Sequence, residues 1–490
     1  MMQSDAQGGL AERINDAAAP VSDAASAVIF YSIRIGEVDL PLVVVWLIVA
    51  ATVFTFYFRF INLRGFAHAL RLVVRRRARH EGDGEISHFE ALSSALSGTV
   101  GLGNIASVPV AIALGGPGAV FWMIVAGFLG MTSKFAECAL AVKYRRTKPD
   151  GTVIGGPMFY IEAVFSRRGL KTLGKFAAVF FAIMTIGASV SVFQVNQSYA
   201  QLSNVTGVTA PLAYGVIVSA LVAVVILGGI RNIARVTRVL VPFMGALYLA
   251  AGWLIILLNI DAAPAAVAAI FKGAFGLEAA GGGIVGALVN GVQRATYSSE
   301  AGVGSAAIAH AAVRTKEPLT EGYVALLEPF IDTVVVCATT ALVIIMTGAH
   351  EPYLYVPRSE IVGIEITSAA FGSAFSWYPY VLLVSVILFA FSTLIAWAYY
   401  GAQAAAYLFG ATRAVDVTFK LTLCALLSTG AAIHLSSIIS FIDSMLFGMC
   451  IPNIIALYLL LPELKRDVRR YEAAHFAPKA GKTGDAPAGT

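Results

Sequence analysis

Two glycine-rich stretches interrupt apolar segments that otherwise favour long helices. The first reads "SGTVGLGNIASV" (97–108) and holds Asn104; the second reads "YSSEAGVGSA" (297–306) and holds Glu300. Each glycine costs a helix about 1 kcal/mol relative to alanine, so both helices are expected to unwind there. Unwound segments expose N–H groups that attract an anion such as a carboxylate, and carbonyl groups that coordinate a cation. The pattern predicts a site for a zwitterionic solute together with a cation.

The composition places these stretches in a membrane protein. Of the 490 residues, 58% are hydrophobic and only 13% are charged, a balance outside the usual range of soluble domains. About 18 apolar residues span a bilayer core of roughly 30 Å. The chain contains eleven such segments, at about 40–58, 89–114, 117–142, 174–200, 210–230, 239–260, 281–312, 322–347, 379–409, 418–435 and 438–461.

The basic residues predict how these segments are oriented. Of the 34 Lys and Arg residues, 28 lie in or beside alternate connections and the C-terminal tail, four lie on the opposite side, and two lie within segments. Basic residues are retained on the cytoplasmic side. We therefore expect an external N-terminus, a cytoplasmic C-terminus and a multi-pass protein of the cell (inner) membrane.

The two breaks lie five segments apart, so the broken helices would cross the bilayer in opposite directions. This arrangement predicts an all-α integral membrane protein of eleven transmembrane helices, built as one extra N-terminal helix plus an inverted five-plus-five repeat. The expected divisions are an external N-terminal segment (1–39), a membrane domain (40–462) with repeats at about 88–260 and 280–462, and a disordered cytoplasmic tail (463–490).

Charged side chains inside apolar segments are costly and therefore mark interior positions. Glu137 follows Lys134 by three residues, so the two could pair on one helix face; alternatively, Glu137 could accept hydrogen bonds from the second break. Glu300 could help to bind a cation or could cap the second half-helix. Three further residues are expected to pair or brace helices, with proton transfer as the alternative for the two acids: Arg294, Asp332 and Asp443.

Uncharged polar residues in the segments add further candidates. Gln194 is expected to face the interior, because an amide facing lipid would lack a hydrogen-bond partner. Ser392 and Thr393 could bond back to their own helix, or their hydroxyl oxygens could bind a hard cation such as sodium. Trp397 lies one turn beyond Thr393.

Several other functions are disfavoured. The four cysteines lie inside apolar segments without a CxxC spacing, which favours neither a disulfide framework nor a zinc site. The net charge of +5 comes from residues flanking apolar segments, so no nucleic-acid partner is expected. No HExxH motif or defensible Ser/His/Asp set indicates an enzyme. An ion channel remains an alternative, since broken helices also line pores.

Five segments between about 86 and 462 together resemble the alanine or glycine:cation symporter family. They read "SALSGTVGLGNIASVPVAIALGGPGAVFWM", "GGPMFYIE", "YSSEAGVGSAAIAHAA", "FAFSTLIAWAYYG" and "IPNIIALYLLL". The resemblance implies a leucine-transporter-type fold and sodium-driven, in some members proton-driven, import of small neutral amino acids such as alanine or glycine. Sodium would be the co-transported cation, with no other cofactor. Another small zwitterionic solute is an alternative, and the oligomeric state stays open.

The resemblance also implies roles for particular residues. One sodium would bind the carbonyls of Ser97 and Val100 and the hydroxyls of Ser392 and Thr393. A second cation would lie near Asn104, the Thr99 carbonyl and Ser298. Bulky side chains at Tyr297 and Trp397 would restrict the substrate to short side chains. The implied substrate contacts are Thr99, Gly101, Gly103, Asn104, Gln194, Tyr297, Ser298, Gly302, Thr393 and Trp397, with Glu137 and Glu300 as structural or coupling residues.

Overall fold

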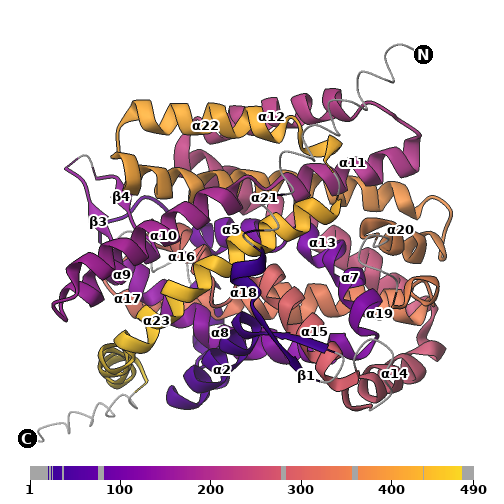
Figure 1. Cartoon of the computed structure of the whole chain (residues 1–490), viewed down its shortest axis with the longest axis horizontal. Coiled ribbons are helices and arrows are strands. Elements are labelled where there is room, and N and C mark those ends of the chain that lie inside the picture. Colours follow the sequence, from indigo (N-terminus) through magenta and orange to yellow (C-terminus); the bar gives the residue numbers. More distant parts are fainter. Residues whose placement is uncertain are drawn as a thin grey trace, which may run out of the picture.

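The computed structural model describes residues 20, 24, 26–35, 38–74, 82–149, 151–276, 283–355, 362–433 and 435–476. Helices make up most of this part of the chain (Figure 1). The first half contains α2 (Leu42–Tyr57), α3 (Ile61–Arg64), α4 (Phe66–Val74), α5 (His88–Thr99), α6 (Leu102–Ile105), α7 (Ser107–Gly115), α8 (Gly118–Tyr144), α9 (Pro157–Ser166), α10 (Lys171–Ser189), α11 (Val192–Thr206), α12 (Pro211–Ile226) and α13 (Gly229–Leu258).

The second half continues with longer and more irregular helices. These are α14 (Ala263–Phe275), α15 (Gly283–Ser299), α16 (Ala306–His310), α17 (Pro318–Ala325), α18 (Leu327–Pro329), the π-helix η3 (Phe330–Cys337), α19 (Ala338–Met346), α20 (Ile364–Gly372), α21 (Tyr378–Phe409), α22 (Arg413–Leu427) and α23 (Leu435–His475). Short 3₁₀ turns in the described part of the chain are η1 (Ile260–Ala262), η4 (Glu351–Tyr353) and η6 (Gly430–Ala432).

Two small antiparallel ribbons correct the expectation of a purely α-helical chain. Strands β1 (Ser32–Ile35) and β2 (Val38–Pro41) pair with Ser32 opposite Pro41, directly before α2. Strands β3 (Arg146–Thr147) and β4 (Val153–Ile154) pair after α8. Each ribbon is too short for hydropathy patterning to detect, because a strand of two to four residues shows almost no alternation.

The eleven segments expected from the sequence all coincide with helices in the described residues, but they do not all qualify as spans. Among the described residues, seven helices are long and apolar enough to cross a membrane, or eight if the bent pair at 88–115 counts as one span. Helices α2 and α12 have only 16 residues each, and the second break divides its segment into α15 and α16. The count of eleven and the inverted repeat therefore stay predictions.

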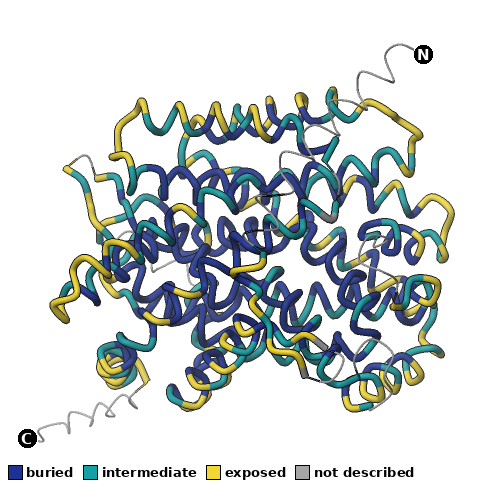
Figure 2. The backbone as a smooth tube through the Cα atoms, viewed as in Figure 1, coloured by how far each residue is buried: buried dark blue, intermediate teal, exposed yellow. Residues whose placement is uncertain are grey.

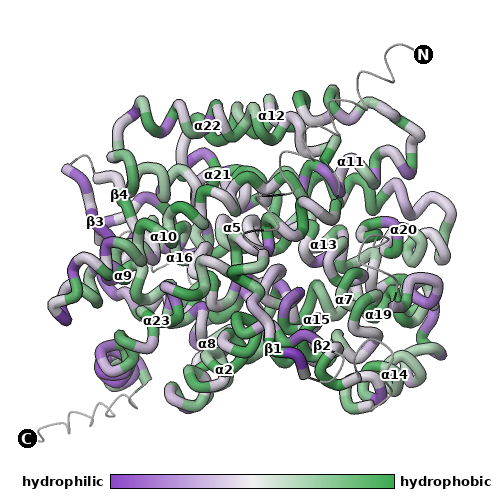
Figure 3. The backbone as a smooth tube through the Cα atoms, in the orientation of Figure 1, coloured by the Kyte–Doolittle hydropathy of each residue, from purple (hydrophilic) through white to green (hydrophobic). Residues whose placement is uncertain are grey.

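The outer surface of the helix bundle is apolar. Helices α12, α13 and α22 expose large hydrophobic side chains, among them Val224, Trp253 and Leu421. Figure 2 shows buried residues concentrated in the interior, and Figure 3 shows hydrophobic residues along α12 and α22 on the outside. Such a surface requires a hydrocarbon environment, and the chain is a multi-pass membrane protein.

Both predicted breaks are present. Helix α5 ends at Thr99 and α6 begins at Leu102, and the two parts of this broken helix are bent by 51°. Helix α15 ends at Ser299, and the chain then adopts positive φ angles at Glu300 (54°), Gly302 (88°) and Gly304 (89°) before α16. Glycine adopts this conformation readily, whereas Glu300 is strained and must be held by its contacts.

The C-terminal helix extends beyond the predicted end of the membrane domain at 462. Helix α23 continues to His475, so the expectation of disorder from residue 463 is wrong for 463–475. Ion pairs explain the extension, because Lys143 at the end of α8 contacts both Glu463 (2.5 Å) and Asp467. Residues 477–490 and the basic run at 75–79 lie outside the described residues.

Candidate functional site

A small buried pocket lies between the two breaks and helices α11, α21 and α23. Its volume is about 20 Å³, while a single water needs about 10–15 Å³ on the same measure. The pocket therefore admits a solute only if its walls move apart, which disfavours large substrates. The lining residues are Gly98, Thr99, Gly103, Ala188, Ser191, Phe193, Gln194, Tyr297, Glu300, Trp397, Ile442 and Leu446.

Asp332 from η3 forms hydrogen bonds with residues of both broken helices. The Asn104 amide donates to the Asp332 carboxylate (2.6 Å) and to its backbone carbonyl (3.0 Å). The Ser298 hydroxyl donates to the other carboxylate oxygen (2.8 Å), as does that of Thr333 (2.7 Å). All four side chains are buried. Asn104 and Ser298, expected near one cation, therefore meet around a carboxylate whose role the sequence left open between bracing and proton transfer.

A second group of predicted residues gathers where α5 ends against α21. The Ser97 hydroxyl donates to the Ser392 carbonyl (2.7 Å), and the Ser392 hydroxyl bonds back to the carbonyl of Phe389 (2.9 Å). Thr393 Oγ1 is buried and has no hydrogen-bond partner among the described residues. It lies so close to Gly101 that a Cβ there would overlap it. A buried oxygen without a donor suits a cation ligand.

Gln194 holds the start of the second half-helix of the first break. Its Oε1 accepts a hydrogen bond from the backbone N–H of Leu102 (3.2 Å), and it also lines the pocket. The N–H of Gly101 is bonded by Asn104 Oδ1 (2.9 Å). Side chains thus satisfy two N–H groups that the break frees from the helix.

Glu300 joins the second break to α21. Its carboxylate accepts from the Trp397 indole N–H (3.0 Å) and from the Ser305 hydroxyl. These contacts hold the left-handed residue in place and turn one carboxylate towards the pocket. Among the described hydrogen bonds, no backbone N–H of α16 donates to the Glu300 side chain. Glu300 therefore does not cap α16 by accepting from its N–H groups.

Glu137 is linked to the second break through Asn453 on α23 and also interacts with the backbone of Gly302. The Asn453 amide donates both to Glu137 Oε1 (2.8 Å) and to the Gly302 carbonyl (2.9 Å), and its oxygen accepts from the Tyr160 hydroxyl. Gly302 itself packs against Leu47 and is not among the residues that line this pocket, so its substrate contact stays a prediction. Asn453 was not predicted from the sequence, although it is a lone amide in the apolar segment 438–461.

The other charged residues pair between helices. Lys134 lies 3.2 Å from Glu328 on α18, so it forms its ion pair with another helix and not with Glu137, which was one of the two alternatives for that acid. Arg294 forms an ion pair with Asp443, and its guanidinium lies 5.2 Å from the Tyr297 ring centroid beside the pocket. The prediction that Arg294 pairs with an acid is confirmed.

A multi-pass helical protein with two broken helices around a buried pocket is typical of secondary transporters. Residues 29–485 match the model of the sodium:alanine symporter family. The chain belongs to this family.

Similar proteins agree with this assignment. The chain is 36% identical to the sodium/alanine symporter AgcS of Methanococcus maripaludis over 86% of its length and 92% of the relative's. It is 32% identical to the probable sodium/glutamine symporter GlnT of Bacillus subtilis, covering 86% of this chain and 85% of that protein. The family relationship supports a transporter rather than an enzyme, and amino-acid:cation symport as its activity.

A solved structure supports the fold. The crystal structure of MhsT in complex with L-phenylalanine superposes with a TM-score of 0.53 at 14% identity, covering 77% of this chain and 89% of that chain. The expected leucine-transporter-type fold is confirmed at this level.

Proposed function

We propose that the protein is a sodium-coupled symporter that imports small neutral amino acids, such as alanine or glycine, by alternating access. The observation that carries the proposal is the narrow pocket between the two breaks, walled by Tyr297 and Trp397. Its present size leaves no room for a long side chain, whereas a methyl group or hydrogen needs only a small movement of the walls. No cofactor beyond the transported cation is needed.

Sodium is assigned first to the oxygens around Thr393. The unpartnered Thr393 hydroxyl lies beside Gly101, and Ser97 and Ser392 are joined directly by a hydrogen bond. The proposed ligands are the Ser97 and Val100 carbonyls with the Ser392 and Thr393 hydroxyls. Sodium would displace the Ser392 hydroxyl from its bond to the carbonyl of Phe389, at the cost of one neutral hydrogen bond.

A second cation is assigned to the carboxylate of Asp332. Asn104 and Ser298 already surround this carboxylate, and the Thr99 carbonyl lies in the same break. A fully buried carboxylate is costly without a compensating positive charge, which supports a cation there during part of the cycle. This assignment adds Asp332 to the residues named from the sequence.

The substrate is placed with its ammonium group towards Glu300 and its carboxylate towards the first break. Glu300, Gly103 and Thr99 all line the pocket, so the pocket combines an acidic side chain with backbone near the start of a half-helix, where partial positive charge favours a carboxylate. The membrane orientation proposed is that read from the basic residues, with the N-terminus external and the C-terminus cytoplasmic.

Uptake by the full-length protein in proteoliposomes tests the proposal. We expect [14C]alanine to accumulate when sodium is high outside, to stop when choline replaces sodium, and to be inhibited by unlabelled alanine or glycine but not by leucine. A proton gradient without sodium serves as the comparison for proton coupling. Absence of gradient-driven uptake of every small amino acid would contradict the proposal, and unsaturable flux would indicate a channel.

A further inference from the structure

Away from the pocket, five buried ionisable side chains from five helices form a contiguous group. We call it the histidine cluster: His88 (α5), Lys134 (α8), His310 (α16), Glu321 (α17) and Glu328 (α18). All are fully buried except His88, whose side chain is 8% exposed. The proposed transport mechanism uses none of them, although α5 and α16 are halves of the two broken helices.

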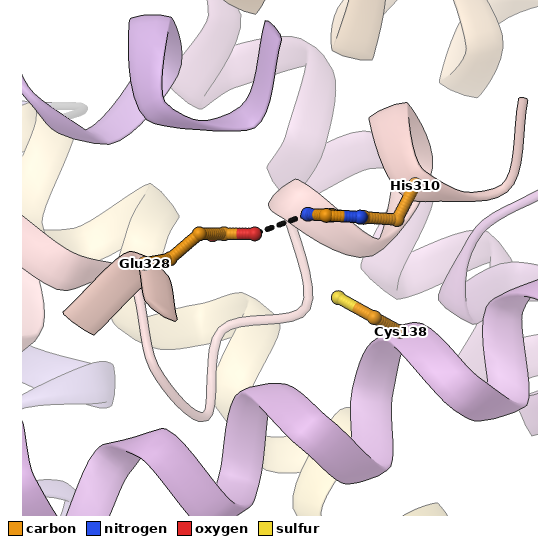
Figure 4. Close-up of side chains that lie close together, drawn as sticks. All are labelled: Cys138, His310 and Glu328. Carbon is orange, nitrogen blue, oxygen red and sulfur yellow. Dashed lines mark hydrogen bonds and ion pairs between the residues drawn. The ribbon is translucent and has the colours of Figure 1, made fainter. Parts of the chain in front are cut away.

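His310 lies between two carboxylates. Its Nδ1 is 2.5 Å from Glu321 Oε1, and its Nε2 contacts Glu328 Oε1. Figure 4 shows the ring aimed at Glu328 with Cys138 beside it. The remaining carboxylate oxygens are also occupied, since His88 Nδ1 contacts Glu321 Oε2 and Lys134 lies 3.2 Å from Glu328 Oε2.

These contacts require one more proton than neutral histidine and ionised carboxylates supply. An ionised carboxylate only accepts, and a neutral imidazole has one donor and one acceptor nitrogen. The two nitrogen–oxygen contacts of His310 need two hydrogens, so an additional proton must reside on the ring or on a carboxyl group. With that proton, and with His88 neutral, the five residues carry no net charge; without it they carry one buried negative charge.

A metal ion fits this geometry poorly. Cys138, His310 and Glu328 place potential ligand atoms within 4.8 Å of one another. However, His310 Nε2 touches Glu328 directly, leaving no space for an ion between them, and the Lys134 ammonium already occupies the other oxygen. A proton is the cation that the contacts accommodate.

We propose that the histidine cluster is a proton-binding site that fastens α5 and α16 to α17 and α18. Both His88 and His310 bind Glu321, so the halves of the two broken helices meet on one carboxylate. Loss of the proton turns a ring lone pair towards a carboxylate, which favours separation of these helices. The other charged groups within reach in the described residues are Glu137, Glu300 and Asp332 near Lys134, and Arg145 near Glu321.

The site therefore binds its proton while the end of the molecule at which α5 begins is closed, and releases it when that end opens. The basic residues predict this end to be cytoplasmic. Turnover would then depend on the pH on that side even if sodium alone drives uptake.

The variant Glu328→Gln keeps the contact between His310 and residue 328 but removes its need for an additional proton. The amide of the new side chain donates to His310 Nε2, while its oxygen still faces the Lys134 ammonium, so neutral His310 makes both contacts without an additional proton. Labelling of Cys138 by a maleimide reports opening, because this thiol is buried beside the cluster. Peptide mass spectrometry on the purified full-length protein measures it, with Cys424 as internal reference.

At about pH 6 we expect Cys138 to label at the same rate in wild type and E328Q. At about pH 9 we expect it to label about tenfold faster in wild type than in E328Q, as for loss of one charge-assisted hydrogen bond. The matched control His350→Gln, whose imidazole instead faces the Ile344 carbonyl at 3.3 Å, should follow wild type. A wild-type to E328Q ratio that is the same at both pH values would overturn the proposal. Protection of Cys138 by Zn²⁺ at about pH 6 would overturn it in favour of a metal site. The assay needs neither sodium nor substrate, so its result is independent of the transport assay.

Discussion

The Asn104 amide donates to both the carboxylate and the backbone carbonyl of Asp332. Asn104 belongs to the first break and Asp332 to the π-helix η3, and Ser298 from the second broken helix binds the same carboxylate. A single buried acid thus connects the two irregular segments. A cation at this point would contact both halves of the transporter at once.

Asp332→Asn should weaken cation binding more than folding. The amide keeps the size of the side chain but removes its charge, and contacts to charged groups contribute about 1.5–3 kcal/mol. We expect the sodium concentration for half-maximal alanine uptake to rise about tenfold or more. The matched control Asp416→Asn on α22, which pairs with Lys420 at 2.7 Å, should leave it unchanged. Equal sodium dependence in D332N and wild type would exclude Asp332 from a cation site.

Thr393→Val removes the hydroxyl that has no partner. Since no hydrogen bond is lost within the protein, the melting temperature should stay the same or rise, with less than about 1 kcal/mol of change. Sodium affinity should fall about tenfold if the oxygen is a ligand. Ser385→Ala on the same helix, whose hydroxyl bonds to Val381, is the control. An unchanged sodium titration would contradict the assignment.

Gly101→Ala should abolish uptake for a steric reason. The new Cβ would overlap Thr393 Oγ1, so the break and α21 would have to move apart. The control is Gly245→Ala on α13, where a Cβ meets nothing within 4 Å. We expect G245A to transport normally and G101A to lose sodium-dependent uptake while still reaching the membrane. Normal transport by G101A would show that the contact is dispensable.

The Arg294–Asp443 ion pair predicts an asymmetric double-mutant cycle. Arg294→Met leaves a buried carboxylate unpaired, which costs about 3–5 kcal/mol. Adding Asp443→Leu removes that charge, so the double variant should recover most of the lost stability. Thermal unfolding in detergent, followed for wild type, both single variants and the double variant, measures the coupling. Additive losses would mean that the two residues do not stabilise each other.

The sequence was sufficient to locate the breaks but not their partners. Glycine clustering at 98–103 and 302–304 predicts unwinding by local energetics alone. The partner of Lys134 depends on which helix packs against α8: Glu137 is near in sequence, yet Glu328 forms the ion pair. Helix periodicity gives the face of a residue, whereas contacts between helices depend on the tertiary arrangement.

In the candidate site, too, individual residues could be predicted from the sequence, whereas contacts between helices could not. Gln194, Tyr297 and Trp397 were predicted and line the pocket. Asp332 was noticed as a costly charge, but its position between the two breaks depends on a π-helix that no sequence pattern marked. Asn453 lies more than 300 residues from Glu137 in the chain, and hydropathy does not reveal such a link.

The π-helix η3 fixes the direction in which Asp332 points. A π-turn accommodates one more residue than an α-turn, so it changes which side chains of Phe330–Cys337 face Asn104 while the regular helix on either side keeps nearly the same phase. Successive residues of a helix differ in direction by about 100°, so a shift of Asp332 by one position would turn its carboxylate away from Asn104. The phase of the helix, as well as the identity of its side chains, therefore determines whether Asn104 and Ser298 contact the same carboxylate.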